Sequence, residues 1–413
     1  MGLLDRLLSR RPTRDAFAKL AAAVLEKSGA SNLQYDPAEF SLRAGSVDRT
    51  FFLENAYSDY CHAQKDKDRQ SCLARYVSSF LQTSVVPRDF ASAKANLMPV
   101  VRDPAYYSLT LLKFQSDGKS TSNLDYATTP VAPGLLAALA FDSEHTIMSI
   151  DRSTLEGWGV DFGQALAIAV ENLRDRTPAS GFKQIASGLY ISEFGDSYDS
   201  ARLLLPDMFY RLALNGDPVI FAPNRNQLWV TGKYDAAGLG AILKFGPESH
   251  FSQGHSLSPN LYALADGKLV GFLPDDSAQR LLAENIQRRR AAMDYDQQTE
   301  CLYALHKREN VDLFVGKYSL FERKDGTQFS ICVWSNGIDS LLPKADTIAF
   351  VVDPTNEQNP DRVMVPWQNA FPVIRELMEE QPDLAPVRYR ARKFPDSAQL
   401  AELRKLARDA TLT

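Results

Sequence analysis

Apolar residues recur every three to four positions in several stretches of the chain, and each stretch predicts an amphipathic helix. The clearest carries its apolar stripe from Phe17 to Leu25 and ends at Gly29, a typical C-terminal helix residue. Another begins at Asp161, with Gln164 in the capping-box position. Further helices are predicted around residues 55–62, 73–81, 90–98, 206–214, 236–245, 281–290, 373–380 and 397–408.

Shorter apolar runs bounded by turn residues predict strands, most of them joined to their neighbours as hairpins. These runs are residues 33–44, 49–53, 106–114, 135–141, 145–150, 189–193, 219–222, 228–231, 261–264, 268–272, 311–321, 328–334 and 347–352. We also expect Leu203–Leu205 to be extended, because a residue before a proline avoids the α region.

Helices and hairpin-linked strands alternate irregularly along the chain. This order predicts an α+β fold, with helices packed on antiparallel or mixed sheets, rather than a doubly wound parallel fold. We divide the chain into an N-terminal α+β subdomain (residues 1–98), a central α+β subdomain (99–275) and a C-terminal α+β appendage (276–413).

Composition narrows the functional class. The 413 residues include 46 Lys+Arg and 51 Asp+Glu, so the net charge is −5, and general nucleic-acid binding is not expected. With 45% hydrophobic and 23% charged residues the chain is an ordinary globular protein. The four scattered cysteines (Cys61, Cys72, Cys301 and Cys332) are too few for a disulfide scaffold, and no apolar run is long enough to cross a membrane. These features predict a cytoplasmic protein.

The first eleven residues form a short amphipathic pattern. Four leucines between Leu3 and Leu8 share one helical face, and Arg6, Arg10 and Arg11 lie off it. No apolar run of secretory length follows, so a secretory leader is not expected. Such a helix would bind a membrane at most peripherally, and the alternatives are a frayed end or a helix docked on the body.

The least ordinary segment follows the predicted strand at 189–193. It places Asp196, Tyr198, Asp199, Ser200 and Arg202 in a strand-to-helix connection, where functional residues often lie. In a ligand site, Arg202 would clamp a phosphate or carboxylate, and the two aspartates would bind a cation or act as acid and base. In a purely structural loop, Asp and Ser bond the local backbone and Arg202 pairs with one of the aspartates.

Established catalytic and cofactor motifs are missing from the sequence. There is no GxSxG, HExxH, GxxxxGK[ST] or CxxC, so we predict no catalytic residues, no metal ligands and no cofactor. We assign ordinary core or surface roles to the histidines and tryptophans, and a solvated face to Arg288–Arg290. The alternative for Pro366, Trp367 and Phe371 is an exposed edge that meets a partner.

Several segments of residues 1–275 resemble the YtpQ-like family of uncharacterised bacterial proteins. The matching segments are residues 151–160, 169–174, 196–206 and 258–262, with looser agreement at 35–37 and 55–60. The family pattern often has glycine where this chain has Ser197, and a polar residue where it has Ala201. The resemblance implies a shared fold and a bacterial source, and it carries no established activity.

Two functions follow from these patterns. The first is a non-enzymatic, cytoplasmic binding or regulatory protein that takes a protein partner or a small anionic ligand. The alternative is an unrecognised hydrolase that uses the Asp196, Asp199 and Arg202 loop. A buried Arg202 paired with its neighbours favours the first, whereas convergence of these three side chains in an open pocket favours the second.

Overall fold

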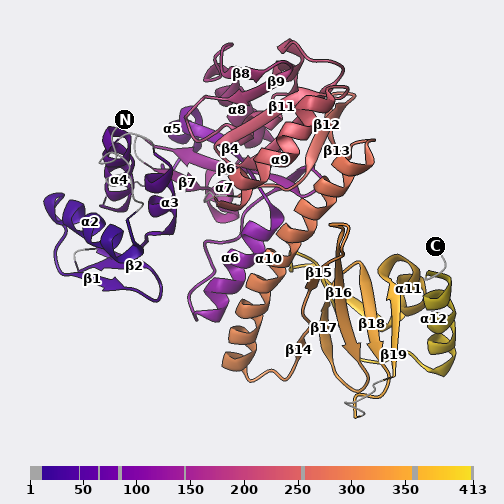
Figure 1. The fold of residues 1–413 in the computed structure, drawn as a ribbon. Coiled ribbons are helices and arrows are strands. Elements are labelled where there is room, and N and C mark those ends of the chain that lie inside the picture. Colours follow the sequence, from indigo (N-terminus) through magenta and orange to yellow (C-terminus); the bar gives the residue numbers. More distant parts are fainter. Residues whose placement is uncertain are drawn as a thin grey trace, which may run out of the picture.

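The computed structural model describes residues 12–45, 47–63, 66–81, 86–143, 146–252, 256–355 and 361–410, so the helix predicted within residues 1–11 lies outside the described residues. Figure 1 shows three parts in chain order: an N-terminal unit (described residues 12–81), a central body (86–276) and a C-terminal unit (311–410). The long helix α10 (Ser277–Glu309) runs from the central body to the C-terminal unit. Within the described residues, none of the helices combines the length and apolarity that crossing a membrane requires.

The N-terminal unit has its own hydrophobic core. Its elements are α2 (Arg14–Lys27), β1 (Leu33–Asp36), β2 (Ser41–Ala44), β3 (Val47–Phe52), α3 (Glu54–His62) and α4 (Asp66–Leu81), with the strands paired antiparallel in chain order. The predicted helix over Phe17–Leu25 is confirmed as part of α2, which Thr13 caps by accepting a hydrogen bond from the Ala16 N–H. The core cluster around Phe17 contains only residues of this unit. The unit therefore packs largely on itself.

The central body contains two antiparallel sheets. Its elements are α5 (Phe90–Ala93), η1 (Lys94–Asn96), β4 (Leu97–Arg102), α6 (Pro104–Ser116), β5 (Thr129–Ala132), β6 (Leu135–Asp142), β7 (Ile147–Ser149), α7 (Arg152–Trp158), α8 (Phe162–Asp175), β8 (Phe182–Ala186), β9 (Leu189–Ser192), η2 (Ser200–Leu204), η3 (Pro206–Arg211), β10 (Pro218–Asn224), β11 (Gln227–Gly232), α9 (Ala236–Ser252), β12 (Leu261–Ala265) and β13 (Lys268–Phe272). The first sheet has the order β4-β6-β5, with β7 also paired to β6, and the second has the order β13-β12-β10-β11-β9-β8.

Strand alternation packs these sheets into layers. Val219 and Phe221 on one face of β10 contact α9, whereas Ile220 on the other face joins the core that includes Leu135 of the first sheet. Helix α8 then covers β4 on the outer side of the first sheet. The turns η2 and η3 pack into these layers: Ala201 of η2 lies in a core cluster with Met98 of β4, and Phe209 of η3 lies in the cluster that contains Ile220.

The C-terminal unit contains mixed sheets. Its elements are β14 (Phe314–Val315), β15 (Ser319–Glu322), β16 (Gln328–Ser335), β17 (Ser340–Pro343), β18 (Thr347–Val351), β19 (Arg362–Pro366), α11 (Trp367–Ile374), η4 (Arg375–Leu377), β20 (Met378–Gln381), β21 (Arg388–Ala391) and α12 (Ser397–Ala410). The pairs β14–β17 and β16–β18 are parallel, and the other strand pairs described in this unit are antiparallel. Together with the sheets of the other two parts, this confirms the predicted α+β fold with antiparallel and mixed sheets.

Helix α10 connects the central body to the C-terminal unit. Asp276 caps its start by accepting a hydrogen bond from the Gln279 N–H, and Asn310 ends it in the left-handed conformation. Ile286 packs in the core beneath α9, and Tyr295 lies in the core of the C-terminal unit. The sequence predicted a helix only over residues 281–290, because the polar composition of the remainder hides its buried face.

The prediction of a strand at residues 106–114 is wrong, since this segment lies in α6. Asp103 caps α6 by accepting from the Ala105 N–H, and Pro104 occupies the first turn, where its missing N–H costs nothing. The buried residues are Ala105, Ser108, Leu109 and Leu112, which follow helical spacing. A short apolar run alone does not distinguish a strand from a buried helix, and here the helical spacing decides.

Several further predictions differ from the structure, among them the following. Leu203 and Leu204 lie in the 3-10 turn η2, and only Leu205, directly before the proline, leaves the helical region. The helix predicted at 373–380 begins earlier, at Trp367, and its second half is η4 and strand β20. The single strand expected at 311–321 is divided between β14 and β15, which belong to different sheets.

Arg388 of β21 is fully buried, and its guanidinium bonds neutral acceptors. Its Nε donates to Gln298 Oε1 at 2.5 Å, and its Nη1 donates to the backbone oxygens of Gly316 and Leu341. Its Nη2 donates to Thr299 Oγ1 at 2.7 Å. Burial lowers the pKa of Arg388 to about 10. These bonds tie α10 to β21, to β17 and to the segment that follows β14.

We expect Arg388→Ala to destabilise the C-terminal unit by about 3–5 kcal/mol, because buried acceptors lose their donor and a cavity remains. Calorimetric melting of the full chain measures this loss. Arg392→Ala is the matched control, since Arg392 follows the same strand but its side chain is exposed and pairs with Glu379. The control is expected to melt close to the wild type, and equal losses in both variants would contradict the assignment.

Candidate functional site

Arg202 is buried and paired with Asp196. Its side chain is 0% exposed, and its Nη1 and Nη2 donate to the two carboxylate oxygens of Asp196 at 2.9 and 2.7 Å. Its Nε donates to Thr177 Oγ1, and its guanidinium carbon lies 3.7 Å from the ring centroid of Phe194. The Asp196 carboxylate is stabilised by these bonds, although burial opposes them, and its pKa is lowered. The pair therefore fixes the loop and leaves Arg202 no open face for a ligand.

The backbone of this loop is shaped around the same pair. Gly195 and Ser197 both adopt positive φ, of 68° and 69°. This conformation is easy for glycine and unusual for serine. A side chain at Gly181 would collide with the Phe194 ring, so glycine is needed where that ring packs. The loop is thus held by sterics as well as by charge.

The other predicted loop residues point away from a common site. Asp199, Ser200 and Tyr198 are buried, at 1%, 1% and 3% exposure. Neither carboxylate oxygen of Asp199 has a hydrogen-bond partner that meets ordinary geometry, and burial raises the pKa of Asp199, with the nearby Ser192 hydroxyl only opposing the shift. Asp196 and Asp199 therefore do not converge in an open pocket, and Asp196 alone of the five predicted residues borders one.

That pocket is a cavity of about 410 Å³ between the N-terminal unit and the central body. In Figure 1, α3 and α4 lie beside β7, and Thr146 before β7 donates to Ser79 of α4 at 3.5 Å. The described residues that line the cavity are Asn55, Arg75, Tyr76 and Ser79 from the N-terminal unit, and Asp142, Ser143, Thr146, Ile147, Gly195, Asp196, Ser197 and Arg225 from the central body.

Arg225 lines this cleft without an ion-pair partner among the described residues. Its Nε is buried without a hydrogen-bond partner, and no ion pair joins its guanidinium to a carboxylate in the described part of the chain. Burial, together with repulsion from Arg102, lowers the pKa of Arg225. The field of Asp59 reaches it, but that carboxylate already accepts a hydrogen bond from the Tyr76 hydroxyl at 2.7 Å. A half-buried cation of this kind attracts an anion.

The other carboxylates of the cleft are committed to other arginines. Asp142 accepts a bond from Arg176 at 2.5 Å, and Asp196 accepts both bonds from Arg202. Arg75 lies at the edge of the cleft with its side chain 60% exposed, and its Nη2 is 4.0 Å from Asp59. With the acidic groups paired, the excess charge of the cleft is positive.

The sequence did not predict Arg225 as a site residue, because it stands in an ordinary hairpin turn. The turn Pro223-Asn224-Arg225-Asn226 between β10 and β11 is held by Asn224, whose Oδ1 accepts from the Asn226 N–H. The Arg225 carbonyl accepts from the Ser200 N–H at 3.1 Å, which places this turn against the 194–202 loop. One signal was available: an arginine in a turn of otherwise uncharged residues.

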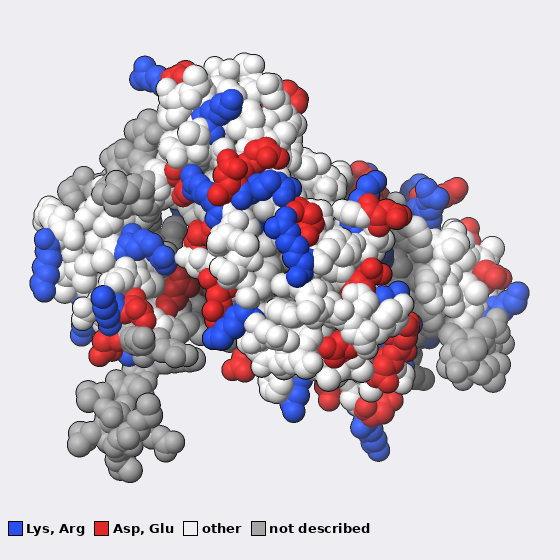
Figure 2. All heavy atoms as spheres, turned by 90° about the horizontal axis from the view of Figure 1, so that it is seen from above, with Lys and Arg blue, Asp and Glu red and all other residues white. Residues whose placement is uncertain are grey.

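The outer surface offers no comparable concentration of charge on the face that Figure 2 shows. There, Lys and Arg side chains lie intermixed with Asp and Glu. Many are joined in exposed pairs such as Arg174–Asp207 and Lys183–Glu193. Exposed pairs of this kind contribute little to binding or stability. Attraction of an anion therefore depends on the local arrangement inside the cleft.

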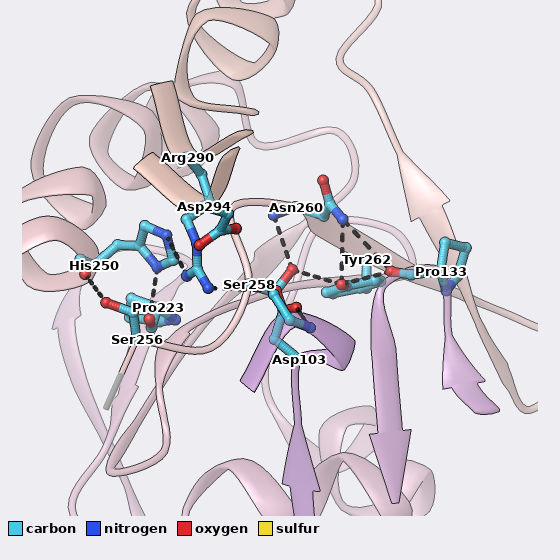
Figure 3. A network of polar contacts seen from close by, with 11 residues as sticks. Asp103, Pro133, Pro223, His250, Ser256, Ser258, Asn260, Tyr262, Arg290 and Asp294 are labelled. Atoms are coloured by element: carbon cyan, nitrogen blue, oxygen red, sulfur yellow. Dashed lines mark hydrogen bonds and ion pairs between the residues drawn. The ribbon is translucent and has the colours of Figure 1, made fainter. Parts of the chain in front are cut away.

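A second polar cluster lies where α10 meets the central body (Figure 3). Arg290 Nε donates to both oxygens of Asp294, its Nη2 lies 3.6 Å from Asp103, and its Nη1 lies 3.3 Å from His250 Nε2. The predicted solvated face at Arg288–Arg290 is therefore wrong for Arg290, whose side chain is only 12% exposed. Burial raises the pKa of Asp103 to about 6. This cluster joins three helices and borders none of the cavities described.

His250 is a neutral member of that cluster. Its Nδ1 donates to the Pro223 carbonyl oxygen at 2.7 Å, which leaves Nε2 to accept from Arg290. Burial lowers the pKa of His250 to about 4. The neighbouring Ser258 and Tyr262 hydroxyls lie 2.6 Å apart, and Tyr262 donates to the Pro133 carbonyl oxygen (Figure 3). Among the described residues, no group of three or more His, Cys, Asp or Glu side chains is placed to hold a metal ion.

Comparisons of the chain with protein-family models, with curated proteins and with solved structures find no match. The resemblance of residues 1–275 to the YtpQ-like family therefore stays a prediction. The geometry of the cleft is therefore the main indication of function.

We expect Asp196→Asn to destabilise the central body by about 3 kcal/mol at neutral pH, because it leaves the buried Arg202 without its anion. Since the folded pKa of Asp196 lies below its ordinary value, this contribution is present above roughly pH 4 and is lost as the pH falls further. Denaturant unfolding from pH 3 to 8 should show the two proteins converging in acid. A constant difference at every pH would contradict the pairing.

Asp199→Asn should act in the opposite direction. The raised pKa of Asp199 means that ionisation opposes folding, so the penalty grows as the pH rises from roughly 4 through the folded pKa. The variant is therefore expected to melt above the wild type at pH 7–8 and together with it near pH 4. Melting curves in matched buffers measure this, and a lower melting temperature at pH 8 would show that the carboxylate has a stabilising partner.

Proposed function

We propose that this protein is a non-enzymatic, cytoplasmic binding protein that holds a small anionic ligand in the cleft between its N-terminal unit and its central body. The observation that carries the proposal is Arg225, a half-buried arginine whose Nε is buried and for which the described part of the chain supplies no carboxylate partner; it lines a cavity of ligand size. Leaving such a charge unpaired costs stability, which a functional site tolerates more often than a purely structural one.

The walls of the cleft support a binding role. Arg75 adds a second cation from the N-terminal unit, and Ser79 and Asn55 add groups able to hydrogen-bond an anion. The ligand would thus contact the two bodies that the Thr146–Ser79 hydrogen bond also joins. Binding and the docking of the N-terminal unit would support each other.

A hydrolase built on the 196–202 loop finds less support. Asp196 is bonded at both oxygens by Arg202, and Asp199 is buried. An acid–base pair needs both groups within reach of the same substrate atoms, and these two share no open pocket. We therefore favour binding over catalysis.

The cytoplasmic part of the proposal rests on the cysteines, which are too few and too scattered in the sequence for a disulfide scaffold. Bacterial origin rests on the resemblance alone.

The direct test is Arg225→Gln, with inorganic phosphate and citrate as probes in isothermal titration calorimetry. We expect binding to weaken roughly ten- to a hundredfold, the range for losing one charged hydrogen-bonding partner. The melting temperature without probe should stay unchanged or rise, because an unpaired buried charge is removed.

The matched control is Arg404→Gln, which removes an arginine paired with Asp361 on the C-terminal unit. It should bind both probes like the wild type. The proposal is wrong if neither probe binds the wild type, or if Arg225→Gln binds them unchanged.

A further inference from the structure

We infer that the ligand of this cleft is an organic phosphate monoester whose remaining part carries hydroxyl groups, as in a sugar phosphate or a polyol phosphate. This inference rests on the proposed function and specifies the chemistry of its ligand. It follows from the placement of the two arginines, from the remaining polar lining and from the size of the cavity.

The two arginines approach the cleft from different bodies. Arg75 belongs to α4 of the N-terminal unit, and Arg225 belongs to the β10–β11 turn of the central body. A carboxylate has two oxygens and matches a single guanidinium fork. A phosphate monoester has three terminal oxygens and a charge of roughly −1.5 to −2 at neutral pH, so it can bond both guanidinium groups at once. The arrangement therefore favours phosphate.

The rest of the lining suits a hydroxylated molecule. Asn55, Ser79, Ser143 and Thr146 bring amide and hydroxyl groups to the wall. The carboxylates of Asp142 and Asp196 also border the cavity, and although each is bonded to an arginine, a carboxylate has further lone pairs that accept from a ligand hydroxyl. The same two carboxylates would repel a second anionic group. The ligand is therefore expected to carry its negative charge at one end.

The size of the cavity exceeds what a bare phosphate ion fills. At about 410 Å³ it lies in the range of small-molecule sites. Among the described lining residues the aromatic side chain is Tyr76, whose hydroxyl is bonded to Asp59 and whose ring lies 5.8 Å from the Arg75 guanidinium carbon. A nucleobase usually stacks on an open ring face, so this wall favours a sugar or polyol over a base.

Matched ligand pairs test the inference on the full chain by calorimetry at pH 7.5. Glucose 6-phosphate is compared with glucuronate, and glycerol 3-phosphate with glycerate, with inorganic phosphate and glucose as references. We expect at least one organic phosphate to bind tenfold or more tightly than both its carboxylate counterpart and inorganic phosphate. Glucose should not bind measurably.

Two variants add a readout that a merely structural role would not change. Arg75→Gln should weaken the organic phosphate about tenfold while changing carboxylate binding much less, whereas Arg225→Gln should weaken both. Arg75 is largely exposed, so its variant is expected to fold like the wild type. Arg404→Gln again serves as the control outside the cleft.

The outcomes separate the inference from the proposed function. If carboxylates bind as tightly as the organic phosphates, or inorganic phosphate does, and Arg225→Gln abolishes that binding, the ligand class is wrong and the anion site stands. If no anion binds in an Arg225-dependent way, both are wrong. Phosphate preference that persists in Arg75→Gln would also overturn the two-arginine arrangement.

Discussion

The ion pair between the buried Arg202 and Asp196, which borders the cavity, is the interaction on which the cleft depends. It fixes a loop whose backbone takes two left-handed residues, Gly195 and Ser197, and it fills the guanidinium fork with a carboxylate from the same loop. The loop can then serve as a wall against which the Arg225 turn is hydrogen-bonded. Because both carboxylate oxygens of Asp196 accept hydrogen bonds from Arg202, Asp196 does not neutralise Arg225. Arg202, the arginine that the sequence predicts as a ligand residue, is thus structural, and Arg225 is the one that remains to bind an anion.

Two fully buried arginines and the half-buried Arg225 show three ways of placing a cation in this protein. Arg202 has a carboxylate and Arg388 has neutral acceptors on several segments, whereas Arg225 has no ion pair within the described residues and its buried Nε has no hydrogen-bond partner there. The first two join parts of the chain that are distant in sequence, as a planar group with five donors is suited to do. The third performs no such joining through its guanidinium. This contrast, rather than burial alone, separates the candidate binding residue from the structural ones.

The fold class and many elements could be predicted from the sequence, because the apolar period and the caps are local properties. The helix after Thr13 and the hairpin around Asp266-Gly267 are examples. The strand predicted at 106–114 was wrong although the helical spacing of Ala105, Ser108 and Leu112 was present, since a short apolar run alone does not distinguish a strand from a buried helix. The role of Arg225 as a candidate binding residue could not be predicted from the sequence, because it depends on how the fold pairs the nearby carboxylates with other arginines. The pairing of Arg202 with Asp196 was foreseen as one of two alternatives, since six residues of separation allow it within a single loop.

The hydrogen bonds of His250 connect the turn that borders the cleft to α10, the helix that leads into the C-terminal unit. Its Nδ1 holds the carbonyl of Pro223, two residues before Arg225, and its Nε2 meets Arg290 of α10. Helix α10 has 33 residues, about 50 Å of rigid rod, and its far half is clamped by Arg388. The turn that carries Arg225 and the sheets of the C-terminal unit are therefore both attached to α10. The neutral imidazole of His250 links the turn to the helix, and Arg388 links the sheets to it.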